Sequence, residues 1–72
     1  MTREVPRYGE ALRAFVGELH GVVPDLRNYE VARAIGMDAP SFSRAMQSRA
    51  ALTDEQRSEL ARYWQQVMRG GE

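Results

Sequence analysis

Apolar residues recur every three or four positions along most of the chain, which is the pattern of helices that bury one face. The first such stretch is predicted to open at Pro6, a residue suited to a first helical turn, and to end near Gly21. Its predicted core face comprises Tyr8, Leu12, Phe15, Val16 and Leu19. Val22 and Val23 are expected to enter the core as the chain crosses over.

Two short helices joined by a tight turn are predicted from Asn28 to Gln47. The first is expected to begin after Asn28, whose side chain suits an N-cap, and to bury one stripe. That stripe is Val31, Ala32 and Ile35. Gly36 is expected to end the helix, because glycine adopts the left-handed conformation without a steric penalty.

The second short helix has a clear start in the sequence. Asp38 is placed as its N-cap, and Pro40 falls in the first turn, where a missing N–H costs nothing. The predicted buried stripe is Phe42, Ala45 and Met46. A small residue at Ala32 lets the two helices cross closely at a steep angle, which is the geometry of a helix-turn-helix.

A last helix is predicted over residues 53–68, after Leu52 plugs the core. Thr53 and Gln56 have the spacing of a capping box, in which the side chains at the two ends of the first turn each bond the other's backbone. No segment alternates apolar and polar residues with period two. The fold class is therefore predicted as all-α: a small four- to five-helix bundle forming one domain over residues 1–72, with its motif at 28–47.

The segment 28–47 resembles the helix-turn-helix of the phage-repressor/Cro (Xre-type) family. The residues that carry the resemblance are Val31-Ala32, Gly36, Met37 and Phe42-Ser43-Arg44. Two features depart from that family: Asn28 replaces a frequent glutamine, and its Glu-Asn-Gly-Lys run is matched only loosely at residues 46–49. The resemblance implies a lambda-repressor-like fold and sequence-specific binding of double-stranded DNA by a transcriptional regulator. Such a protein would be a repressor that acts as a homodimer on a pseudo-palindromic operator.

In this architecture the second helix of the motif reads the major groove. The base contacts predicted on it are Arg44, Gln47, Ser43, Pro40 and Ala39. Arg44 would donate twice to guanine and Gln47 would pair with adenine, while the first residues of the helix would touch a thymine methyl. Four further residues are expected to contact phosphates: Asn28, Arg33, Ser41 and Arg49.

The charge balance leaves a second hypothesis open. Ten basic residues, all arginine, face ten acidic ones, so the net charge is zero, whereas DNA-binding domains usually carry a basic excess. Residues 27–49 hold four arginines against two acids, a local charge of +2. The alternative is a protein-interaction module, such as an antitoxin or an anti-defence factor. The apolar pair Ala39-Pro40 favours it.

The remaining chemistry excludes several classes of function. The chain has no cysteine, and its single histidine, His20, lacks neighbouring ligands, so we expect a surface histidine, no metal or other cofactor, and no enzyme. No apolar run is long enough to cross a bilayer, which predicts a cytoplasmic protein without membrane contact. At 72 residues the core is small, and the apolar stripe of the last helix, Leu60, Trp64, Val67 and Met68, is expected to pack into it. If Tyr63 and either Val67 or Met68 stay exposed, Tyr63, Val67 and Met68 would instead form the contact with a partner subunit.

Overall fold

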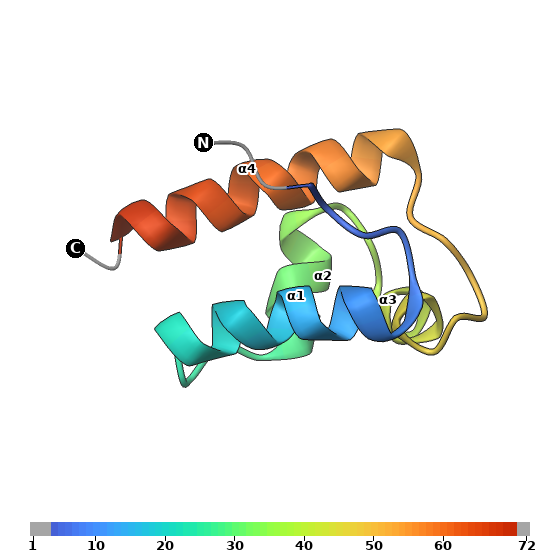
Figure 1. Ribbon diagram of the computed structural model, residues 1–72, viewed down its shortest axis with the longest axis horizontal. Coiled ribbons are helices and arrows are strands. Elements are labelled where there is room, and N and C mark those ends of the chain that lie inside the picture. The colour runs from blue at the N-terminus through green and yellow to red at the C-terminus, as the bar shows by residue number, and fades with distance from the viewer. Residues whose placement is uncertain (1–3, 71–72) are drawn as a thin grey trace.

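The computed structural model describes residues 4–70, and this part of the chain is all-helical, with no strand. The four helices are α1 (Gly9–Val22), α2 (Asn28–Ala34), α3 (Ala39–Met46) and α4 (Asp54–Gly70). Figure 1 shows the long helices α1 and α4 running in similar directions, with the short α2 and α3 set across them. None of the described helices combines the length and apolar character needed to span a membrane. The four helices and the absence of strands within residues 4–70 confirm the predicted all-α class.

The core lies where the four helices meet. Its buried apolar residues are Val5, Leu12, Phe15, Val16, Leu19, Leu26, Val31, Ala32, Ile35, Phe42, Ala45, Met46, Leu52 and Leu60. α3 packs against α1 and α2, and α4 packs against the same two helices. Trp64 of α4 adds a half-buried ring 6.1 Å from that of Phe15. The predicted stripes of α2 and α3 are confirmed, as is the plug at Leu52.

The start of α1 differs from the prediction. The helix begins at Gly9, not at Pro6, because residues before it run extended and the backbone N–H of Leu52 donates to the carbonyl of Arg7 at 2.8 Å. Gly9 turns the chain into the helix with φ of 73°. Tyr8 therefore lies outside the helical repeat and is 55% exposed, so its predicted burial was wrong.

The end of α1 also lies later than predicted. The helix continues to Val22, which is 39% exposed, so the prediction that Val22 enters the core was wrong. Val23 is half-buried against the core, as expected. The backbone N–H of Val23 donates to the carbonyl of Leu19 at 2.8 Å and closes the last turn.

The junction between α2 and α3 forms largely as predicted. Gly36 has φ of 76°, the left-handed conformation expected at the end of α2. The predicted N-cap of α2 was wrong: Asn28 is the first helical residue and Arg27 precedes it. The carboxylate of Glu30 accepts from the backbone N–H of Arg27 at 3.0 Å, so the start of α2 is held by an acid from within the helix.

α3 and α4 begin at the residues that the sequence indicates. Asp38 directly precedes α3, and Pro40 lies in its first turn. Thr53 Oγ1 accepts from the Gln56 N–H at 3.1 Å, while Gln56 Oε1 accepts from the Thr53 N–H at 2.9 Å, which confirms the capping box. α4 then runs two residues beyond the predicted end, to Gly70.

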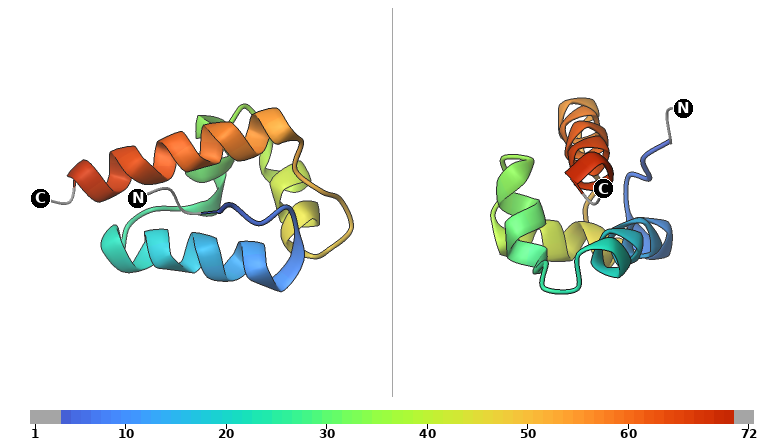
Figure 2. Two further views of the ribbon diagram at one scale, coloured as in Figure 1. Left: turned by 45° about the horizontal axis from the view of Figure 1, so that its top comes forward. Right: turned by 90° about the vertical axis from the view of Figure 1, so that its left-hand side faces the viewer.

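The extended segment before α1 holds α4 in place. Arg57 on α4 donates from Nε to the carbonyl of Val5 at 2.9 Å, and Arg7 pairs with Asp54 at the same distance. Figure 2 shows this segment on one side of α4 and α2 on the other. The first turn of α4 is thereby tied to the N-terminal part of the chain.

Candidate nucleic-acid interface

The outward side of α3 is the surface on which the sequence places its base contacts. With one side of α3 buried, Ala39, Pro40 and Arg44 are exposed on its other side, and so is Gln47, the residue that directly follows the helix. Ser41 and Ser43 are half-buried at its edges. The amphipathic pattern alone determines this division, because residues three and four apart share a side of a helix.

Arg44 lies within a small polar cluster on α3. Its Nη2 donates to the hydroxyl of Ser41 at 3.2 Å. Hydrogen bonding by the same hydroxyl is the main cause that lowers the pKa of the Asp38 carboxyl, and the positive charge of Arg44 acts in the same direction. The exposed guanidinium is therefore hydrogen-bonded to Ser41 and lies within electrostatic reach of the Asp38 carboxylate.

Gln47 and Arg49 follow directly after α3. The amide nitrogen of Gln47 donates to the hydroxyl of Ser43 at 3.3 Å, so these two predicted base contacts touch each other. The backbone N–H of Arg49 donates to the carbonyl of Arg44 at 2.9 Å, which places exposed Arg49 at the end of the helix. Ser48, between them, has φ of 64°, an uncommon conformation for a residue other than glycine.

The predicted phosphate contacts on α2 do not share one side of it. Asn28 and Arg33 are both exposed, but five residues correspond to a rotation of about 140° round a helix axis. The side chain of Asn28 has a partner that the sequence did not indicate: its Oδ1 lies 2.8 Å from Nε2 of His20 on the last turn of α1. The pair spans the loop between α1 and α2, so no local pattern could have revealed it.

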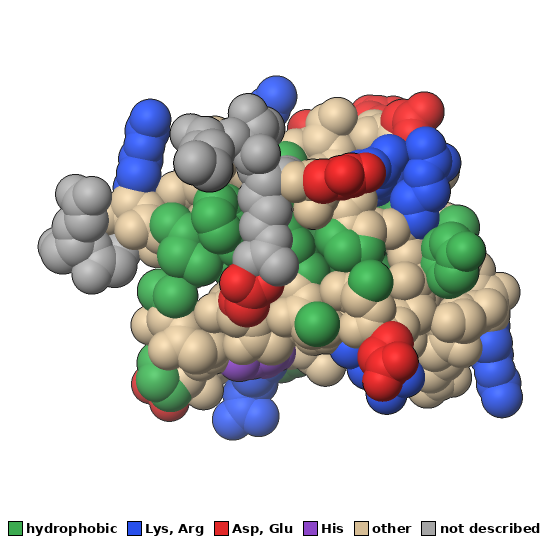
Figure 3. Space-filling view, viewed as in Figure 1, with side chains coloured by type: hydrophobic (Ala, Val, Ile, Leu, Met, Phe, Trp, Pro, Cys, Tyr) green, Lys and Arg blue, Asp and Glu red, His purple; other side chains and the backbone are tan. Residues whose placement is uncertain are grey.

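The predicted dimer residues on α4 belong partly to the core. Tyr63, Val67 and Met68 are half-buried and pack against the buried cluster. Burial raises the pKa of the Tyr63 hydroxyl, and the charge of Glu30 on α2 acts in the same direction. On the face shown in Figure 3, hydrophobic side chains gather between α1 and α4, with charges of both signs around them.

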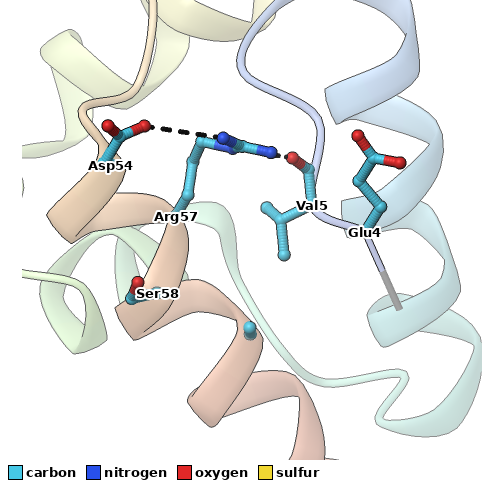
Figure 4. A pocket seen from close by; sticks show the side chains of 6 residues that line it. Glu4, Val5, Asp54, Arg57 and Ser58 are labelled. Atoms are coloured by element: carbon cyan, nitrogen blue, oxygen red, sulfur yellow. Dashed lines mark hydrogen bonds and ion pairs between the residues drawn. The ribbon is translucent and has the colours of Figure 1, made fainter. Parts of the chain in front are cut away.

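A pocket of about 350 Å³ lies between the N-terminal segment and α4. Figure 4 shows the guanidinium of Arg57 inside it, directed at both Asp54 and the carbonyl of Val5. The distance from Arg57 Nη1 to Asp54 Oδ1 is 3.5 Å, so the cation that lines the pocket is already engaged by the protein. We assign this site to the attachment of α4.

Two further observations bear on the class of function. Within residues 4–70, no three side chains of His, Cys, Asp or Glu come close enough together to hold a metal ion. Comparison of the chain with protein-family models, curated proteins and solved structures found no match. The functional argument therefore depends on the residues and their geometry.

Proposed function

We propose that this protein is a sequence-specific double-stranded DNA-binding transcriptional regulator that reads the major groove with α3. The observation that carries the proposal is the exposure of Arg44 in the middle of a helix whose opposite side is fully packed. In this proposal α2, the turn at Gly36 and α3 act as a helix-turn-helix of the phage-repressor type, within a lambda-repressor-like fold.

The dimensions of α3 suit the groove. An α-helix with its side chains is about 10–12 Å across, and the major groove of B-DNA is about 12 Å wide, so α3 can lie in it. The exposed side chains near the start of α3 are small, because Ala39 and Pro40 come first. Small residues there allow the backbone to approach the bases closely and leave Arg44 to reach furthest.

The hydrogen bonds on α3 support different roles for its polar residues: some order a neighbouring side chain, and others contact bases. Ser41 holds Nη2 of Arg44, which orders a long side chain before DNA arrives and reduces the entropy lost on binding. Arg44 is proposed to donate to guanine, and Gln47 with Ser43 to read a neighbouring base pair. Ala39 and Pro40 would contact a thymine methyl.

Phosphate contacts are proposed for Asn28, Arg33, Ser41 and Arg49, with the strongest case at Arg49. Its position after α3 places a cation beside the groove-facing helix, where the backbone of one strand would pass. Because the net charge is zero, the attraction to arbitrary DNA should be weak, and affinity should depend on the correct sequence.

The regulator is proposed to act as a homodimer that represses by excluding polymerase from a pseudo-palindromic operator. The exposed parts of Tyr63, Val67 and Met68 on α4 would form the two-fold contact. Two copies of α3 would then enter half-sites about 34 Å apart. Analytical ultracentrifugation with and without the operator would measure this directly, and a single copy bound to one half-site would refute the dimer.

The test begins with selection of bound duplexes from a random pool, followed by affinity measurements across a salt series. Arg44→Ala is expected to cost about 1–3 kcal/mol and to relax preference at one base pair. Arg49→Ala should weaken all sequences alike and flatten the salt slope by about one. Arg69→Ala, in the last turn of α4, is the matched control and should change neither. Figure 1 shows this end of α4 far from α3. Equal effects of all three variants would refute the assignment.

A second candidate is a helix-turn-helix module that binds another protein, such as an antitoxin or an anti-defence factor. The zero net charge and the exposed apolar pair Ala39-Pro40 favour it. Retention on heparin at low salt would support DNA binding. Absence of retention, together with a protein that co-purifies and is released by Pro40→Glu, would support this alternative.

A further inference from the structure

The pair formed by His20 and Asn28 joins the end of α1 to the start of α2. Nε2 of His20 lies 2.8 Å from Oδ1 of Asn28. An amide oxygen can only accept a hydrogen bond, so the proton of this bond belongs to the imidazole. This orientation of the amide corresponds to the tautomer of His20 that carries a proton on Nε2.

This arrangement decides which end of the Asn28 amide is available to a ligand. An exposed asparagine can present either an acceptor oxygen or two N–H donors, and only the donors attract a phosphate. With the oxygen engaged by His20, the amide nitrogen is the end that remains outside the pair. An imidazole that donates from Nε2 would favour the orientation of Asn28 in which the amide nitrogen is free to meet an anion.

We propose that His20 is a positioning residue, which turns the amide of Asn28 so that its N–H groups donate to a backbone phosphate of DNA. The inference rests on the proposed DNA binding and adds to it a residue that makes no direct contact with the bases. His20 is half-buried in the last turn of α1, whereas Asn28 is exposed. The imidazole therefore holds the amide from the protein side and leaves its other side open to solvent. Loss of the imidazole would leave the amide free to rotate, and a correctly oriented donor would be present only part of the time.

The first test concerns the free protein and does not depend on DNA. The nitrogen chemical shifts of the His20 imidazole, measured by NMR on the full chain, should show a proton on Nε2. In Asn28→Ala these shifts should move, because the acceptor is lost. A neutral imidazole protonated only at Nδ1 would mean that Asn28 donates to His20 instead, and this result would overturn the inference.

The second test is a double-mutant cycle on affinity for the selected duplex. Asn28→Ala should weaken binding about tenfold or more, as expected for a hydrogen bond to a charged group, and His20→Ala about threefold to tenfold. In the Asn28→Ala background, His20→Ala should have no further effect, because it acts only through the amide. Additive losses would overturn the inference.

Two conservative variants separate positioning from a general structural role. Glutamine carries an N–H donor near the place of Nε2, so His20→Gln should retain most of the affinity that His20→Ala loses. Asn28→Asp keeps the acceptor for His20 but has no donor for phosphate, so it should bind DNA at least tenfold more weakly. Urea midpoints measured for every variant would identify a loss caused by unfolding.

The outcomes distinguish this inference from the proposed function. If the wild-type chain shows no binding that depends on Arg44, the DNA-binding proposal fails and the inference fails with it. If binding depends on Arg44 while His20→Ala binds as the wild type does, only the role of His20 is refuted. Three results together would establish the role of His20. His20→Ala would bind DNA more weakly than the wild type, the same substitution would cause no further loss in the Asn28→Ala background, and His20→Gln would retain most of the wild-type affinity.

Discussion

Gly9 meets Ser48 where α1 begins, and this contact makes a sharp prediction about stability. Gly9 has φ of 73°, and a Cβ added to it would lie 2.5 Å from the Oγ of Ser48. An alanine in the left-handed conformation costs about 1–2 kcal/mol. Forcing Ser48 away from its rotamer costs about 0.5–1.5 kcal/mol more. The lower entropy of the unfolded alanine variant returns about 0.4–1 kcal/mol.

Gly9→Ala should therefore destabilise the fold by about 0.5–3 kcal/mol. For a domain of this size the whole free energy of unfolding is roughly 4–11 kcal/mol, so the loss would be large. Urea denaturation followed by far-UV circular dichroism and by the fluorescence of Trp64 would measure it. Gly17→Ala is the matched control in the same helix, because nothing lies within 4 Å of its added Cβ. That variant should gain about 1 kcal/mol.

A double variant tests the cause of the loss. Ser48→Ala removes the Oγ that a Cβ at Gly9 would meet but leaves the left-handed backbone at both positions. The combination Gly9→Ala with Ser48→Ala should cost less than the sum of the single variants, by about 0.5–1.5 kcal/mol. A Gly9→Ala protein as stable as the wild type would refute the strain argument, and strictly additive losses would refute the contact with Ser48.

Two further predictions concern the helix starts. Thr53→Ala should lower the free energy of unfolding by about 1 kcal/mol, because it removes the oxygen that accepts from the Gln56 N–H; Ser58→Ala, at an exposed site within α4, is the control and should leave it nearly unchanged. For Asp38, whose pKa is lowered in the folded state by the Ser41 hydroxyl, the ionised form stabilises the fold above pH 3.8 and this contribution is lost as pH falls through the lowered pKa. Acid titration of stability should therefore be less steep in Asp38→Asn than in the wild type, and identical curves would show that Asp38 has no such role.

The sequence predicted the buried faces well because helical periodicity reports burial directly. Leu12, Phe42 and Leu60 each fall on an apolar stripe and are almost fully buried. The start of α4 was also predictable, since its capping box involves only residues three apart. In both cases the prediction depends only on residues within one or two helical turns of each other.

The errors occur where distant segments decide the conformation. Tyr8 fits the repeat of α1, but the bond from Leu52 to Arg7 keeps the preceding segment extended and leaves Tyr8 outside the helix. Asn28 looks like an N-cap, but its amide pairs with His20 across the loop between α1 and α2. Such contacts depend on the folded arrangement, and short-range patterns contain no trace of them.

The candidate site contains one feature that the local sequence pattern predicts and others that only the folded structure shows. The exposure of Arg44 follows from the stripe on the other side of α3, whereas its hydrogen bond with Ser41 and its proximity to Asp38 appear only in the structure. Asp38 carries the opposite charge within electrostatic reach of Arg44, so the two residues together add little net charge to the long-range attraction of DNA, which is screened beyond about 8–10 Å. At the short distance of a base edge the donors of Arg44 still act individually. In the proposed function, Arg44 would therefore contribute to discrimination between sequences more than to the salt dependence of binding, which is the reverse of the contribution expected from Arg49.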